Sequence, residues 1–175
     1  TTSRSDMLIV LHMLGNHGPA YFQRYPASYR RWSPTCDTTD LASCSHEALV
    51  NTYDNAVLYT DHVLARTIDL LSGIRSHDTA LLYVSDHGES LGEKGLYLHG
   101  IPYVIAPDEQ IKVPMIWWQS SQVYADQACM QTHASRAPVS HDHLFHTLLG
   151  MFDVKTAAYT PELDLLATCR KGQPQ

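Results

Sequence analysis

The sequence lacks three features that would assign it to common functional classes. Its 12 Lys and Arg are outnumbered by 18 Asp and Glu, so the net charge of −6 leaves no basic surface for nucleic acid or an anionic membrane. No run approaches the roughly 20 apolar residues that a membrane-spanning helix needs. The four cysteines form no C-x-x-C pair, which argues against a zinc site built on cysteine.

An export signal is also missing, because the polar residues 1–6 lead directly into an apolar run. The cysteines nevertheless favour an oxidising compartment. Their number is even, and Cys36 and Cys44 flank a short polar loop that suits a local disulfide. Free thiols in a cytosolic enzyme are the alternative. A chain that uses disulfides without an export signal is expected to be a piece of a longer protein.

Apolar runs predict the strands. Residues 7–13 form a continuous apolar run, the pattern of a parallel strand that is buried on both faces. Residues 81–85 form a second strand, and residues 113–118 form a third in which Pro114 marks the start or an edge. The chain of 175 residues is long enough for one domain with a sizeable core.

Two helices follow from periodicity and from end signals. Apolar residues recur about every three to four positions from His46, and Gly73 ends the pattern. A shorter helix is expected with Ser140 as its N-cap and Gly150 as its stop. The alternation of strands and helices predicts an α/β sandwich with a mostly parallel sheet.

The most informative chemistry lies just after the strand 81–85. Asp86 and His87 offer a hard oxygen and an imidazole nitrogen, a pairing that suits Zn²⁺. Ligands bind at the carboxyl ends of strands in open α/β sheets, and Gly88 leaves room for one beside the backbone. A turn Asp beside a surface His is the alternative interpretation.

Further histidines follow strand ends or lie in Gly-rich loops. His17 in GNHGP and His99 in YLHG can reach the same sheet edge if neighbouring parallel strands deliver their loops there. They could bind a second metal or an anionic phosphate. Glu89 and His12 are candidates for orienting the ligand imidazoles. The alternatives are a solvated loop charge for Glu89 and a strand cap for His12.

Four strings carry a family resemblance: HMLGNHGPAYFQRYP, PTCDTTDLASC, LVNTYDNAVLYTD and SDHGESLGEKGLYLHG. In this order they closely resemble the phosphoethanolamine transferases that modify lipid A, a family that includes the mobile colistin-resistance enzymes. The resemblance implies an alkaline phosphatase/sulfatase-like, three-layer α/β/α catalytic domain in the periplasm, following membrane helices in the bacterial inner membrane. Residues 1–175 would be the C-terminal portion of that domain.

The resemblance also implies roles for residues. Asp86 and His87 match two ligands of the catalytic zinc. His17 and His99 match histidines associated with a second zinc or with the phosphate of phosphoethanolamine. The pair Cys36–Cys44 matches a family disulfide.

By elimination, Cys129 and Cys169 form the second disulfide. The Thr nucleophile and a Glu zinc ligand of the family have no match here. Thr1 and Thr2 lack the matching context, and neither is assigned as the nucleophile. An upstream segment of the same protein is therefore expected to complete the site.

The implied reaction moves phosphoethanolamine from phosphatidylethanolamine to a lipid A phosphate through a phospho-Thr intermediate, which would give resistance to polymyxins such as colistin. Two alternatives stay open. One is a related phosphoethanolamine or phosphoglycerol transferase acting on another periplasmic glycan. The other is an inactive fragment that keeps only the fold.

Overall fold

The computed structural model describes residues 6–120, 125–134 and 139–170, so Thr1 and Thr2 lie outside the described residues. The chain divides into two compact units. One unit comprises residues 10–73 and 81–117 and is called the site unit below; the second is built mainly from residues 118–175.

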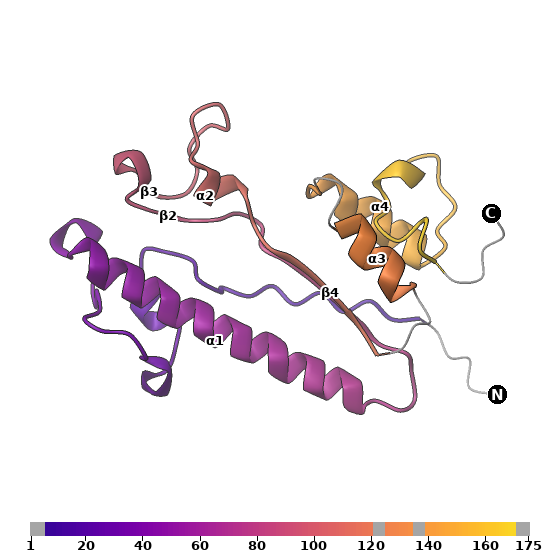
Figure 1. The fold of residues 1–175 in the computed structure, drawn as a ribbon, viewed down its shortest axis with the longest axis horizontal. Coiled ribbons are helices and arrows are strands. Elements are labelled where there is room, and N and C mark those ends of the chain that lie inside the picture. The colour runs from indigo at the N-terminus through magenta and orange to yellow at the C-terminus, as the bar shows by residue number, and fades with distance from the viewer. Residues whose placement is uncertain (1–5, 121–124, 135–138, 171–175) are drawn as a thin grey trace. The chain divides into compact units, whose positions relative to one another are not determined.

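The helices and strands follow one another along the chain as in Figure 1. The α-helices are α1 (His46–Gly73), α2 (Asp108–Ile111), α3 (Gln127–Ala134) and α4 (Asp142–Met151). The strands are β1 (Ala80–Val84), β2 (Ser90–Leu91), β3 (Tyr97–Leu98) and β4 (Met115–Gln119). The 3-10 helices are η1 (Tyr21–Gln23), η2 (Ala27–Tyr29), η3 (Leu41–Ser43), η4 (Glu93–Gly95) and η5 (Pro161–Leu163).

Helix α1 confirms the predicted bounds. The hydroxyl of Ser45 accepts a hydrogen bond from the backbone N–H of Ala48 at 3.2 Å, which satisfies one of the free donors of the first turn. The buried core of the site unit joins Leu49 of α1 to Tyr21 of η1 and Leu91 of β2. The helix therefore anchors both the η1 segment and the β2–β3 hairpin.

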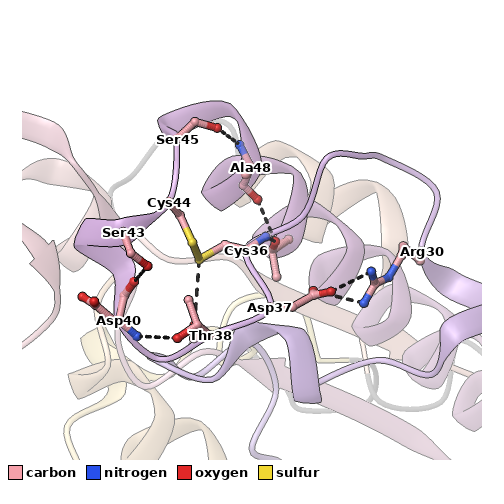
Figure 2. The surroundings of a disulfide bond; sticks show 10 residues. Arg30, Cys36, Asp37, Thr38, Asp40, Ser43, Cys44, Ser45 and Ala48 are labelled. Carbon is pink, nitrogen blue, oxygen red and sulfur yellow. Dashed lines mark hydrogen bonds and ion pairs between the residues drawn. A yellow bond between two sulfur atoms is a disulfide. The ribbon is translucent and has the colours of Figure 1, made fainter.

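A disulfide and buried polar contacts fix the segment before α1. Cys36 and Cys44 are bonded, as predicted, and their Cα atoms lie 5.6 Å apart (Figure 2). The buried Thr52 hydroxyl accepts from the Cys36 N–H at 2.7 Å and donates to the Ala48 carbonyl of its own helix. Arg30 and Asp37 form a bidentate ion pair at the surface (Figure 2).

The described strand pairs are antiparallel. In the β2–β3 hairpin, Ser90 faces Leu98 and Leu91 faces Tyr97. β1 pairs with β4. Ser85 N–H donates to the Pro114 carbonyl at one end of that pair, and Ser120 N–H donates to the Thr79 carbonyl at the other. The end of β1 therefore lies beside the start of β4, so the two strands run antiparallel. The parallel part of the predicted sheet is not represented among the described strands.

The strand predicted over residues 7–13 is wrong for this structure. Residues 7–13 carry no strand assignment, and Met7 to Leu11 are all exposed. A strand exists only beside a hydrogen-bonded neighbour, and none of the described segments pairs with this one. The apolar run alone therefore did not produce a strand.

The second unit contains α3, α4 and the disulfide Cys129–Cys169, which is the predicted pair. Its buried Asp164 is ion-paired with Arg170 and accepts a hydrogen bond from the Tyr159 hydroxyl. The predicted N-cap of α4 is wrong, because the helix begins one residue later and His141 occupies the cap. The Ser140 hydroxyl contacts the Asp142 carboxylate, so its oxygen does not cap the backbone.

No helix among the described residues is long and apolar enough to cross a bilayer.

Candidate functional site

Three imidazoles from separate loops of the site unit form the candidate site. His17, His87 and His99 each offer a ring nitrogen, and these atoms lie within 4.8 Å of one another. The rings of His87 and His99 stack with their centroids 3.8 Å apart, and His17 approaches His99 edge-on at 4.8 Å. The structure thus brings together three of the histidines that the sequence singled out.

Each imidazole has an acceptor beside its Nδ1 atom. His17 Nδ1 lies 2.7 Å from the Gly18 carbonyl oxygen, and His87 Nδ1 lies 3.0 Å from the Gly88 carbonyl oxygen. His99 Nδ1 lies 3.1 Å from a Glu89 carboxylate oxygen. A carbonyl or a carboxylate can only accept, so Nδ1 carries the proton and donates in all three rings. In the neutral form of each ring, Nε2 then presents the lone pair that could bind a metal ion.

Glu89 is the buried hub of the site. Its side chain is only 4% exposed, and it accepts hydrogen bonds from the Gly18 N–H and the Tyr21 hydroxyl, each at 3.1 Å, in addition to His99. Burial, followed by the charge of Glu89, raises the pKa of Tyr21 above its usual value, so the phenol stays protonated and donates. Glu89 thus holds His99 in one tautomer, which is the orienting role predicted for it.

Two glycines allow the close approach of these loops. A Cβ on Gly18 would lie 2.5 Å from the Leu98 side chain and 2.6 Å from the Tyr21 hydroxyl. A Cβ on Gly88 would lie 1.9 Å from the backbone carbonyl oxygen of Glu109, which cannot move aside as a side chain could. The ligand loops therefore depend on glycine at both positions.

The short helix α2 ties the loops that carry His87 and His99. The backbone carbonyl of the buried Gln110 accepts from the Gly88 N–H at 2.9 Å. Its side-chain amide donates to the Ser90 hydroxyl at 2.9 Å and accepts from the Ile101 N–H at 3.4 Å. One residue therefore fixes the backbone on both sides of the imidazole pair.

The other predicted site residues lie differently. The Asp86 side chain is 76% exposed, its Oδ1 accepts from the His87 N–H, and its Oδ2 lies 3.9 Å from His87 Nε2. It sits at the edge of the imidazole cluster and outside the group whose ligand atoms converge. His12 is exposed and is likewise not a member of this group.

A second group with metal-ligating atoms does not qualify as a metal site. Cys129, His133 and Cys169 lie close together, but the two sulfurs are bonded to each other and offer no thiolate.

Sequence reasoning missed Tyr21 and Gln110. Tyr21 is fully buried, and its hydroxyl also donates a hydrogen bond to Glu89. No local signal marks Gln110, because its role depends on loops that lie 9 and 20 residues away in the chain.

The arrangement suits a borderline-soft divalent cation. Three neutral imidazoles with oriented Nδ1–H groups form a donor set typical of zinc, and a carboxylate at the edge could add an oxygen. Such a cluster can also contact anionic oxygens of a phosphate. The chemistry open to the site is therefore metal-assisted reaction at a phosphate or a similar ester.

Comparison with known proteins identifies the family of the chain. Residues 2–154 match the sulfatase family. Phosphoethanolamine transferase EptA of Salmonella typhimurium is 49% identical over 96% of this chain and 32% of its own length. The chain thus spans about a third of the length of this curated relative.

Solved structures give the same result. The C-terminal periplasmic domain of phosphoethanolamine transferase EptC from Campylobacter jejuni is 48% identical with a TM-score of 0.81, covering 93% of this chain and 52% of its own. The integral membrane protein lipooligosaccharide phosphoethanolamine transferase A (EptA) from Neisseria meningitidis is 44% identical with a TM-score of 0.88, covering 93% of this chain and 31% of its own.

These matches confirm the predicted alkaline phosphatase/sulfatase-like α/β fold class, and the similarity within it is to phosphoethanolamine transferases. The chain belongs to the sulfatase family.

Proposed function

We propose that this chain is the C-terminal portion of the periplasmic catalytic domain of a zinc-dependent phosphoethanolamine transferase of the inner membrane. The observation that carries the proposal is the cluster of His17, His87 and His99, in which every Nδ1 donates and every Nε2 is free. The names of the similar proteins supply the transferred group. The Neisseria relative is an integral membrane protein that acts on lipooligosaccharide, which supports a lipid-linked acceptor and a membrane setting here.

In this proposal, His87 and Asp86 would hold the catalytic zinc, and His17 and His99 would hold a second zinc or the phosphate of the donor lipid. A bound zinc would supply Lewis-acid stabilisation of phosphate oxygens and would lower the pKa of a coordinated hydroxyl. Glu89 keeps His99 in the tautomer that presents Nε2, and Gln110 holds the loops at a fixed separation.

The nucleophile would be a Thr in an upstream segment of the same protein. Its oxygen would form a bond to the phosphorus of phosphatidylethanolamine while the bond to diacylglycerol breaks and the leaving oxygen takes up a proton. An oxygen of a lipid A phosphate would then displace the Thr. The added ammonium group would reduce the negative charge of the lipid surface and weaken the attraction for polymyxins such as colistin.

Mass spectrometry of lipid A tests this function in cells that express the full-length protein. We expect lipid A to gain the mass of a phosphoethanolamine group, and the gain to disappear with His87→Ala. His77→Ala is the matched control, because His77 is exposed and lies outside the cluster. Unmodified lipid A despite good expression and added zinc would refute the proposed acceptor, and a phosphoethanolamine group found on another glycan would assign the protein to the related transferases.

A further inference from the structure

The loop between β3 and α2 exposes consecutive apolar side chains. Residues 101–107 read IPYVIAP and contain no charge. Tyr103 is 77% exposed, Val104 96% and Ile105 62%. An isolated exposed apolar residue is normal at a protein surface, whereas three in succession without a charge form an apolar patch that a partner or a membrane can cover. Residues 101–105, which include these three, are called the apolar loop below.

The apolar loop is held in one conformation from its base. The N–H groups of Ile105 and Ala106 both donate to the Pro102 carbonyl at 3.0 Å, which closes a tight turn. At one end Ile101 N–H donates to Gln110, and at the other Pro107 is fully buried. The exposed side chains are therefore presented by a fixed turn, and they need little ordering to bind a partner.

The apolar loop adjoins the candidate site. It begins two residues after His99, and Figure 1 shows it projecting from the part of the site unit that holds β3 and α2. Five residues span at most about 18 Å, so Val104 lies within that distance of His99. The headgroup layer on each side of a bilayer is only about 5–8 Å thick. The chain length therefore permits Val104 to lie beyond the headgroup layer while the site contacts a phosphate within it.

We propose that the apolar loop inserts into the lipid–water interface of the bilayer that carries the phosphate-bearing lipid substrate. This inference rests on the proposed function, because it requires a lipid at the imidazole cluster. Val104 and Ile105 contact acyl chains, and Tyr103 suits the boundary because its ring is apolar and its hydroxyl is polar. No cationic residue lies within the loop, so zwitterionic phosphatidylethanolamine suffices and anionic lipid is not required.

Bromolipid quenching of tryptophan fluorescence tests the insertion without requiring turnover. The full-length protein carrying Val104→Trp is reconstituted in vesicles of phosphatidylethanolamine and phosphatidylcholine with or without brominated acyl chains. Leu70→Trp is the matched control, since Leu70 is an apolar residue of α1 that is 70% exposed. The signal of the native tryptophans, three of which lie in this chain, is subtracted with the parent protein.

We expect brominated lipid to quench position 104 strongly and position 70 weakly. Equal quenching at the two positions overturns the proposal. A blue-shifted emission at position 104 that bromine does not quench also overturns it, because it shows that another part of the protein covers the loop. The quenching measurement gives a result even if no phosphoethanolamine transfer is detected. Failure of the insertion proposal can therefore be distinguished from failure of the proposed function.

A kinetic comparison of charged variants adds a second readout. We expect Val104→Asp to raise the KM for vesicle-borne phosphatidylethanolamine by about tenfold, since a carboxylate replaces the aliphatic group that enters the bilayer. Release of ethanolamine phosphate from a water-soluble ester should be unchanged, and Leu70→Asp should leave both reactions unchanged. Equal losses with the lipid and the soluble ester would show that the substitution damages the site itself and would contradict a role in lipid contact.

Discussion

Replacement of Glu89 separates the two roles of this side chain, holding the loops together and orienting His99. With Glu89→Ala, the Gly18 N–H and the Tyr21 hydroxyl lose their acceptor in a buried environment. Each unsatisfied buried donor costs about 1–3 kcal/mol, which gives about 2–6 kcal/mol for the two. Relief of the buried carboxylate's own desolvation moves the expected loss toward the lower end of that range. The donor on His99 adds little, because that side chain is 31% exposed and water can replace the carboxylate.

Glu89→Gln should lower the free energy of unfolding less than Glu89→Ala does, because only the Tyr21 hydroxyl proton is left without an acceptor. The amide oxygen can accept from Gly18 and His99 as Oε1 does now, and the amide nitrogen can donate to the Tyr21 hydroxyl, which turns to accept. The bond to His99 is then no longer charge-assisted, so zinc affinity should fall by about 10–100-fold.

Urea unfolding and a zinc competition assay with a chromophoric chelator measure the two effects. Glu109→Gln is the control, because it removes the same charge from an exposed side chain of α2. The reasoning is refuted if Glu89→Ala unfolds like the parent, or if Glu89→Gln binds zinc as tightly as the Glu109→Gln control.

Three further predictions concern the frame of the site. Gly88→Ala should destabilise the protein by about 3 kcal/mol or more, since its Cβ would lie 1.9 Å from a backbone oxygen. In the control Gly73→Ala, the added Cβ meets nothing within 4 Å. Thermal unfolding that gives the same stability for the two variants would contradict the close approach at Gly88. Replacing both cysteines by serine should cost about 2.5 kcal/mol for Cys36–Cys44, separated by 8 residues, and about 4 kcal/mol for Cys129–Cys169, separated by 40. Equal or reversed losses in urea unfolding would count against the loop-entropy account. Burial raises the pKa of Tyr21, so the folded state binds the phenol proton more tightly than the unfolded state does. The contribution of Tyr21 to the free energy of unfolding should therefore be fully present below pH about 10 and fall above it. Tyr21→Phe should reduce the slope of this fall, and an unchanged slope between pH 9 and 11 in urea titrations would show that Tyr21 does not contribute.

The elements with strong local signals were predictable. Helix α1 has apolar periodicity, a capping serine and a terminal glycine, and the structure confirms it from His46 to Gly73. Strands β1 and β4 follow apolar runs, and Pro114 immediately precedes β4. Both disulfides are also present as predicted.

The failures have different physical causes. Residues 7–13 have the composition of a buried strand, but a strand needs a partner and none of the described segments supplies one. Ser140 is a good N-cap residue, yet its hydroxyl contacts Asp142 instead of the backbone. Helix α3 was not predicted, and its apolar residues are few and form no clear stripe.

The candidate site was only partly predictable from the sequence. His17, His87 and His99 stand out because they lie in Gly-rich loops, and they do converge. The expected route was a shared edge of parallel strands, whereas the described pairs are antiparallel and the loops are held by Glu89 and Gln110. Asp86, predicted beside His87 as a ligand, is exposed at the edge of the cluster.

The zinc content of the purified full-length protein tests the central claim most directly. Elemental analysis of the parent after dialysis against zinc-free buffer should give at least about one zinc per chain, as expected for a zinc site built on these imidazoles. His87→Ala should lose that zinc, and His77→Ala should retain it. A parent protein without zinc, or His87→Ala with the zinc content of the parent, would contradict the assignment of the imidazole cluster as a metal centre.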